Sequence, residues 1–90
     1  MIRIMTATEP QITTITVDGD LAGEHVTAVE MCVKQALAQG RQVLLFLRDV
    51  ATIDESGRSL LARLAAMRVR LRATGVYCSY VVSKIISTAA

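Results

Sequence analysis

A run of five apolar residues at positions 43–47, Val-Leu-Leu-Phe-Leu, constrains the fold of this chain more than any other feature. The run does not alternate with polar residues, so a strand built from it is expected to be covered on both faces. Apolar residues at helical spacing lie on either side of it in the sequence. A buried strand between two helices is typical of a parallel βαβ unit, and the run therefore predicts an α/β fold.

Shorter patterns predict the other elements. Segments rich in Ile, Thr and Val, or apolar throughout, are expected to be strands, at residues 2–5, 11–17, 42–47 and 76–82. Segments with apolar residues every three or four positions are expected to be helices, at residues 23–39 and 56–74, with a short third helix capped by Ser83. Residues 48–55 are expected to form a polar loop. The predicted fold is α/β, a mixed four-stranded sheet with helices in the order ββαβαβα.

Composition excludes several classes of function. Ninety residues are expected to form a single domain over 1–90. A net charge of +2 and three aromatic residues argue against a nucleic-acid partner. The apolar run is too short for direct membrane insertion, and the N-terminus lacks the apolar segment of a signal peptide. We therefore expect a cytoplasmic protein.

The chain has few residues of the types that usually bind zinc. His25 is the only histidine, and Cys32 and Cys78 stand at spacings unrelated to any zinc motif. We expect no metal site and no cofactor, with both cysteines reduced.

The segment Asp54-Glu55-Ser56-Gly57 marks the start of the second predicted helix. Asp and Ser are favoured at helix N-caps, so either Asp54 or Ser56 is expected to cap it. Gly57 is expected to permit close backbone approach in the first turn. Two adjacent carboxylates without a nearby histidine are typical of a cap and a surface charge rather than an acid–base pair. We therefore expect that the protein is not an enzyme and that it has no catalytic residue.

This segment, placed between an apolar strand and a leucine-rich helix, resembles the Asp-Ser-x-Gly motif of the STAS domain family. Gly19-Asp20-Leu21 resembles that family's Gly-x-Leu element. The resemblance covers nearly the whole chain and implies a STAS-like fold. Its best-known members are bacterial anti-sigma factor antagonists, so it also implies transcription regulation by protein–protein interaction, with an anti-sigma factor or kinase-like regulator as partner.

The resemblance implies where such a partner binds. In these antagonists a kinase phosphorylates the serine that follows the aspartate, and only the unphosphorylated form binds the anti-sigma factor. Here that position holds Glu55, which is acidic and not an acceptor, and Ser56 beside it is a candidate displaced acceptor. Ala22 and Phe46 stand where phospho-regulated members often carry acidic residues. We expect a partner-binding loop without the usual serine phospho-switch, formed by Thr52, Asp54, Glu55, Ser56, Gly57 and Arg58.

The absence of a phospho-acceptor serine at position 55 also fits an alternative function. Small STAS proteins serve as non-phosphorylated accessory subunits of lipid-transport systems, and STAS domains form parts of anion transporters. The identity of the partner would separate this alternative from an anti-sigma role.

A second interface is predicted on the outer side of the helix at 56–74. Ala62, Ala66, Val69 and Ala73 would form one apolar line opposite the leucine stripe. Such a line is expected to contact a partner or a second copy in a homodimer. Alternatively, the alanines simply favour the helix.

Overall fold

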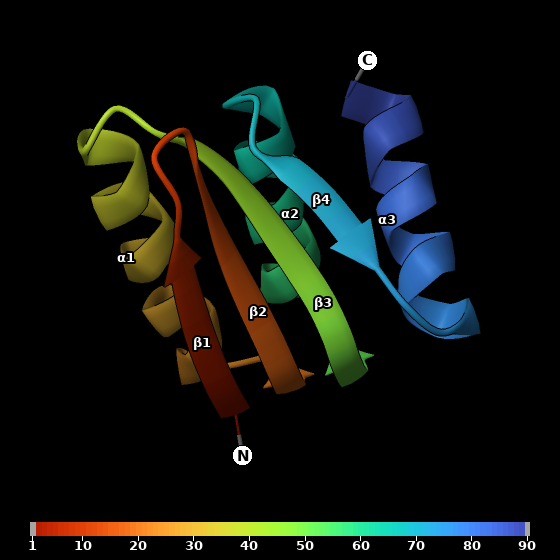
Figure 1. The fold of residues 1–90 in the computed structure, drawn as a ribbon. Helices are drawn as coiled ribbons and strands as arrows, with labels where there is room; N and C mark the ends of the chain where they lie inside the picture. The colour runs from red at the N-terminus through yellow and green to blue at the C-terminus, as the bar shows by residue number, and fades with distance from the viewer. Residues whose placement is uncertain (1, 90) are drawn as a thin grey trace.

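Four strands and three helices follow one another in the order ββαβαβα in the computed structural model (Figure 1). It describes the backbone of residues 2–89 and the side chains of residues 2–87. The strands are β1 (Ile2–Thr8), β2 (Ile12–Leu21), β3 (Gln42–Ile53) and β4 (Arg70–Ala73). The helices are α1 (Glu24–Ala38), α2 (Glu55–Ala66) and α3 (Val76–Ala89). The predicted fold class and element order are confirmed.

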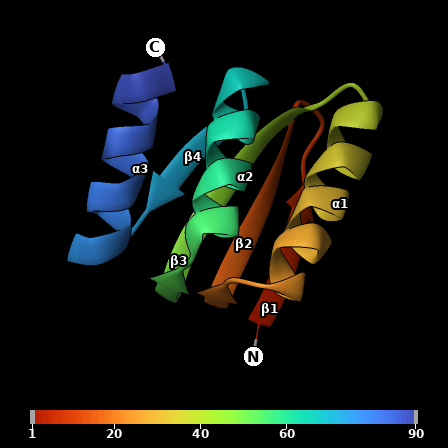
Figure 2. The same ribbon diagram turned by 180° about the vertical axis from the view of Figure 1, so that it is seen from behind.

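The four strands form one mixed sheet in the order β1-β2-β3-β4. β1 is antiparallel to β2, whereas β2, β3 and β4 run parallel to one another. Helices α1 and α2 lie across one face of the sheet, and α3 lies beside α2 at the β4 edge (Figure 2). None of the helices in residues 2–89 is long and apolar enough to cross a membrane.

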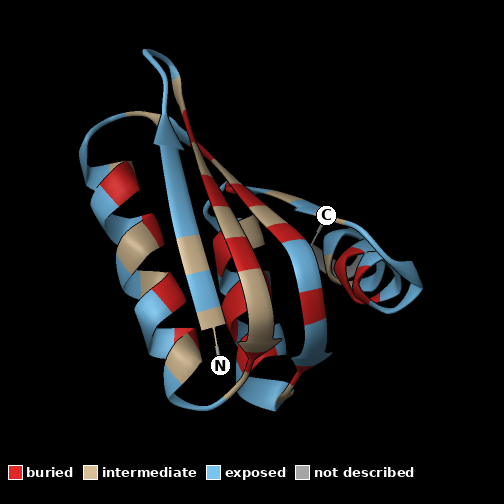
Figure 3. Cartoon of the chain, turned by 60° about the horizontal axis from the view of Figure 1, so that its bottom comes forward, coloured by how far each residue is buried: buried red, intermediate tan, exposed pale blue. Residues whose placement is uncertain are grey.

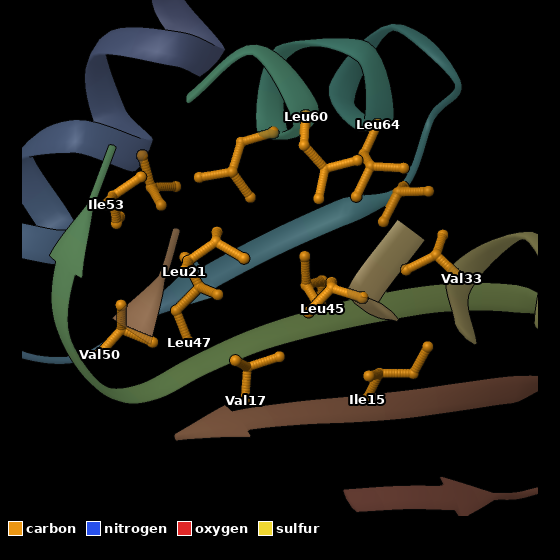
Figure 4. Close-up of a cluster of buried hydrophobic side chains, with 14 of the residues drawn as sticks. Ile15, Val17, Leu21, Val33, Leu45, Leu47, Val50, Ile53, Leu60 and Leu64 are labelled. Atoms are coloured by element: carbon orange, nitrogen blue, oxygen red, sulfur yellow. The ribbon is translucent and has the colours of Figure 1, made fainter. Parts of the chain in front are cut away.

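The core lies between the sheet and the helices, where alternate strand residues meet the apolar stripes of α1 and α2 (Figure 4). Ile15 and Leu45, which are register partners on β2 and β3, have no exposed surface. Helix α2 contributes Leu60, Leu61 and Leu64, and the buried bands of Figure 3 follow the same alternation. Burying each such side chain contributes about 1.5–3 kcal/mol.

The second helix is shorter than predicted. It ends at Ala66 rather than Thr74, because Met67 and Arg68 form a turn in which Arg68 has a φ of 67°. A non-glycine residue in this left-handed region is uncommon, and the sequence carries no glycine to mark the turn. The chain then forms β4, and the strand predicted at 76–82 lies within helix α3.

The predicted interface line is therefore wrong in its geometry. Ala62 and Ala66 are exposed on α2, but Val69 lies beyond the helix and is only 4% exposed. Ala73 is in β4, half-buried against the core. These four residues do not share one helical face.

Strand β3 also differs from the prediction. It continues through most of the predicted polar loop to Ile53, where it pairs with Leu21 at the end of β2 after two register shifts. Leu44 and Phe46, on the side away from the helices, are only half-buried. The apolar run is thus covered by helices on one face and not, as predicted, on both.

Candidate partner-binding site

The loop between β3 and α2 is fixed by the carboxylate of Asp54. This residue has extended backbone, with φ −82° and ψ −176°, and is the N-cap of α2. Its Oδ1 accepts hydrogen bonds from the backbone N–H of Gly57 at 2.8 Å and from Ser56 Oγ at 2.7 Å. Of the two predicted caps, Asp54 is therefore the one that caps the helix, and the Ser56 hydroxyl donates to it.

The other oxygen of Asp54 reaches a second helix. Oδ2 accepts a hydrogen bond from the backbone N–H of Gly23 at 3.0 Å, immediately before α1. The backbone N–H of Asp54 donates to the carbonyl oxygen of Leu21 at 3.2 Å. One residue thus joins the start of α1, the start of α2 and the end of β2.

These contacts keep Asp54 charged. The hydrogen bond from Ser56 lowers the pKa of the Asp54 carboxyl group most, followed by those from the backbone N–H groups of Gly57 and Gly23. A negative charge is also favoured beside helix N-termini, where unsatisfied N–H groups carry partial positive charge. The carboxylate is therefore ionised at neutral pH.

Gly57 brings the segment Asp54-Glu55-Ser56-Gly57 into contact with the Gly19-Asp20-Leu21 element. A Cβ at this position would overlap the carbonyl oxygen of Leu21 and would lie 3.0 Å from Cγ2 of Ile53. The prediction that Gly57 allows close backbone approach is confirmed, and the group approached is the end of the Gly19-Asp20-Leu21 element.

The remaining residues of the predicted loop form an exposed surface. Thr52, Glu55, Ser56 and Arg58 are exposed, while Asp54 is half-buried and Gly57 is buried. We call Thr52, Asp54, Glu55, Ser56, Gly57 and Arg58 the recognition loop.

Ala22 and Phe46 occupy different regions. Ala22 lies between β2 and α1, beside the Gly23 N–H that Asp54 binds. Phe46 lies within β3, seven residues before the strand ends at Ile53. The structure therefore brings only Ala22 of these two positions to the loop.

Helix α3 extends this surface with residues that sequence reasoning missed. A hollow of about 300 Å³ lies beside Arg58, and its other lining residues come from α3: Tyr80, Val81, Lys84 and Ile85. The ammonium group of Lys84 lies 5.5 Å from the centre of the Tyr80 ring. The available signal was the spacing of Tyr77, Tyr80 and Lys84 by three and four residues, which is typical of one helix face.

The groups considered for metal binding lie apart. No group of three or more His, Cys, Asp or Glu side chains that could hold a metal ion is present among the described residues. The ring Nδ1 of His25 lies 3.1 Å from the carbonyl oxygen of Asp20. Cys32 and Cys78 are both free, and the Cys78 thiol donates to the carbonyl oxygen of Val50.

Comparison with known proteins identifies the class. The family model described as STAS domain matches residues 3–81, and the chain belongs to the STAS domain family. The predicted resemblance is thereby confirmed. No curated protein matches the chain.

Two solved structures are similar to it. The crystal structure of an anti-sigma factor antagonist from Mycobacterium paratuberculosis has a TM-score of 0.78 at 14% identity, and the match covers 98% of this chain and 82% of that one. The crystal structure of a protein named Mglu has a TM-score of 0.62 at 26% identity, over 80% of this chain. The match spans only 19% of Mglu.

Proposed function

We propose that this chain is a non-enzymatic regulatory module that binds a partner protein through its recognition loop, in the manner of an anti-sigma factor antagonist. The observation that carries the proposal is the set of hydrogen bonds to Asp54, because they hold the loop in one conformation and leave Glu55 and Arg58 exposed. A preorganised loop loses less conformational freedom when it binds. The structural likeness to a solved anti-sigma factor antagonist supports the same function.

The proposed partner recognition does not use the family's serine switch. Glu55 stands at the acceptor position and supplies a permanent negative charge. Ser56 donates its hydroxyl to Asp54, whose carboxyl pKa is already lowered. A phosphate on Ser56 would add about −1.5 to −2 charges beside the ionised carboxylate of Asp54. Repulsion between these like charges disfavours phosphorylation of Ser56.

The proposed partner is an anti-sigma factor or a kinase-like regulator in the cytoplasm. Two free thiols, Cys32 and Cys78, favour a reducing compartment. The alternative is an accessory subunit of a transport system, and the observation in its favour is Glu55, which leaves no acceptor at the family position.

Affinity capture from the native cell, followed by quantitative mass spectrometry, tests the proposal. The bait is compared with a charge swap in the recognition loop, Glu55→Lys with Arg58→Glu, which leaves the net charge unchanged. The control swaps a pair on α1, Glu30→Lys with Lys34→Glu, whose side chains lie 3.8 Å apart. Glu30 also pairs with Arg63 of α2, so circular dichroism verifies that the control is folded.

The proposal predicts that an anti-sigma factor or kinase-like regulator is enriched by the parent chain and by the α1 swap, and is lost with the loop swap. Enrichment of transport subunits with the same dependence would support the alternative. Equal capture by the loop swap and the parent chain would contradict partner binding through the recognition loop.

A further inference from the structure

The sheet has a second face, which we call the open face, on the side away from α1 and α2 (Figure 1). Strand alternation and register place two cross-strand rows on it. One row is Ala7, Thr14, Leu44 and Arg70, and the other is Met5, Thr16, Phe46 and Arg72. The neighbouring strand residues, such as Leu45 and Leu71, face the helices instead.

The open face is apolar on β3, and Thr14 and Thr16 of β2 lie beside this apolar part. Leu44 and Phe46 are half-buried, and Met5 is 37% exposed at the β1 side. A hollow of about 470 Å³ begins at Leu44 and continues around the β4 edge, and Ile12 and Ile86 are among the residues that line it. A face with such a hollow can accommodate side chains that protrude from a partner.

The β4 side of the open face is positively charged. Arg70 and Arg72 are exposed, and among the side chains of residues 2–87 neither lies within ion-pair distance of a carboxylate. Two carboxylates, Asp18 and its register partner Asp49, lie beyond these rows toward the ends of β2 and β3. Asp18 is bound to Arg48, whose Nε lies 3.1 Å from Asp18 Oδ1. The Asp18 charge is therefore paired, and neither carboxylate is in the rows that hold Arg70 and Arg72.

We propose that the open face binds an acidic amphipathic helix of a partner protein. Apolar side chains of that helix would pack on Leu44 and Phe46, and its carboxylates would pair with Arg70 and Arg72. Helices of this kind dock through apolar anchors at every third or fourth position. Opposite charges would steer the encounter and fix the orientation.

Three other occupants fit this face less well. A second copy of the chain would bring two positively charged faces together, which is repulsive. A flat bilayer surface would not enter the hollow at Leu44, and Leu44 and Phe46 are both half-buried. A nucleic-acid strand needs several stacking rings, and Phe46 is the only aromatic residue in the two rows.

Peptide display provides the test. A library of random peptides of about 16 residues, about four helical turns, is selected on the intact 90-residue chain. The selected peptides are then titrated against Arg70→Glu with Arg72→Glu, and against Phe46→Ser. The control, Lys34→Glu with Arg63→Glu, makes the same change in net charge on the helix layer, where both residues pair with Glu30. Circular dichroism verifies that each variant is folded.

The proposal predicts selected peptides rich in Asp and Glu, with apolar residues every third or fourth position. Their affinity should fall at least about tenfold in the β4 double variant and in Phe46→Ser, and should change little in the control. If a variant does not fold, the amide resonances of the parent chain decide instead. Addition of the peptide should then shift the amide resonances of Thr16, Phe46 and Arg72 rather than those of α1.

Three results would overturn the proposal. Selected peptides could lack acidic residues, or could bind the β4 double variant as tightly as the parent chain. Vesicles of phosphatidylcholine and phosphatidylglycerol, or a single-stranded RNA, could shift the open-face resonances when no selected peptide does. Binding to the open face is separable from the proposed function, because the recognition-loop swap leaves the open face unchanged.

Discussion

The carboxylate of Asp54 accepts a hydrogen bond from the backbone N–H of Gly23 at 3.0 Å, although 31 residues separate them in the chain. The same carboxylate caps α2 through the N–H of Gly57. The starts of α1 and α2 are therefore held by one negative charge, which makes the geometry of the recognition loop depend on the ionisation of a single side chain.

We predict that Asp54→Asn lowers the stability of the protein in a pH-dependent way. The hydrogen bonds lower the pKa of Asp54 in the folded state, so its contribution is complete above the unfolded pKa of about 3.9 and is lost as pH falls through the lower folded value. At pH 7 the variant should have the lower Tm, because Asn has one acceptor oxygen in place of two and cannot accept from both Gly57 and Gly23. Thermal unfolding between pH 7 and pH 2 should show the two proteins converging at the acid end. A constant difference across that range would exclude this role.

Gly57→Ala tests the contact between α2 and the end of β2. The new methyl group would overlap the carbonyl oxygen of Leu21, so the variant should lose about 1–3 kcal/mol even though alanine favours a helix. Ser59→Ala, at an exposed position of the same helix, should change stability by no more than about 0.5 kcal/mol. Urea unfolding measures both. If Gly57→Ala stabilised the protein, the backbone of Gly57 would not lie as close to the carbonyl oxygen of Leu21 as described.

Val69→Glu distinguishes the observed end of α2 from the longer helix that the sequence predicts. Val69 is 4% exposed, so a carboxylate there should destabilise the fold by at least about 2 kcal/mol. Ala62→Glu, on the exposed side of α2, should stay within about 0.5 kcal/mol of the parent. Denaturant titration of the two variants gives the comparison, and equal, small effects would favour the longer helix with Val69 on its surface.

The two cysteines should differ in reactivity. Burial raises the pKa of the Cys78 thiol, and the thiolate is the reactive form. Cys32 is only half-buried on α1. In the folded protein iodoacetamide should therefore modify Cys32 first, and Cys78 should react only as the protein unfolds. Mass spectrometry over time measures both rates, and equal rates under native conditions would contradict the packing of α3.

The sequence is sufficient to predict the order of the elements as far as residue 66, because the apolar run indicates a strand and the stripe around Val29 and Val33 indicates a helix. It does not predict that β3 continues to Ile53 or that helices cover only one face of that strand. It fails after Ala66 because Leu71 and Ala73 suit either a continued helix or an inward-facing strand. In the structure, the turn at Met67 and Arg68, where Arg68 has a φ of 67°, ends the helix and leads into β4. Since that turn contains no glycine, composition gives no warning.

The recognition loop is predictable in part. Asp54 and Gly57 follow from capping preference and from the family motif, as does the expected location of the loop. The bond from Gly23 to Asp54 and the approach of Tyr80 and Lys84 to Arg58 depend on how distant elements pack, and no local pattern encodes that packing.

The affinity of the captured partner for two single variants tests the central claim most directly. Isothermal titration calorimetry is run with the parent chain, Glu55→Ser and Ser56→Ala. The account predicts that Glu55→Ser changes the affinity roughly fivefold, equivalent to about 1 kcal/mol for one surface charge, and that Ser56→Ala changes it little. Equal affinity of Glu55→Ser and the parent chain, with a large loss for Ser56→Ala, would contradict the account.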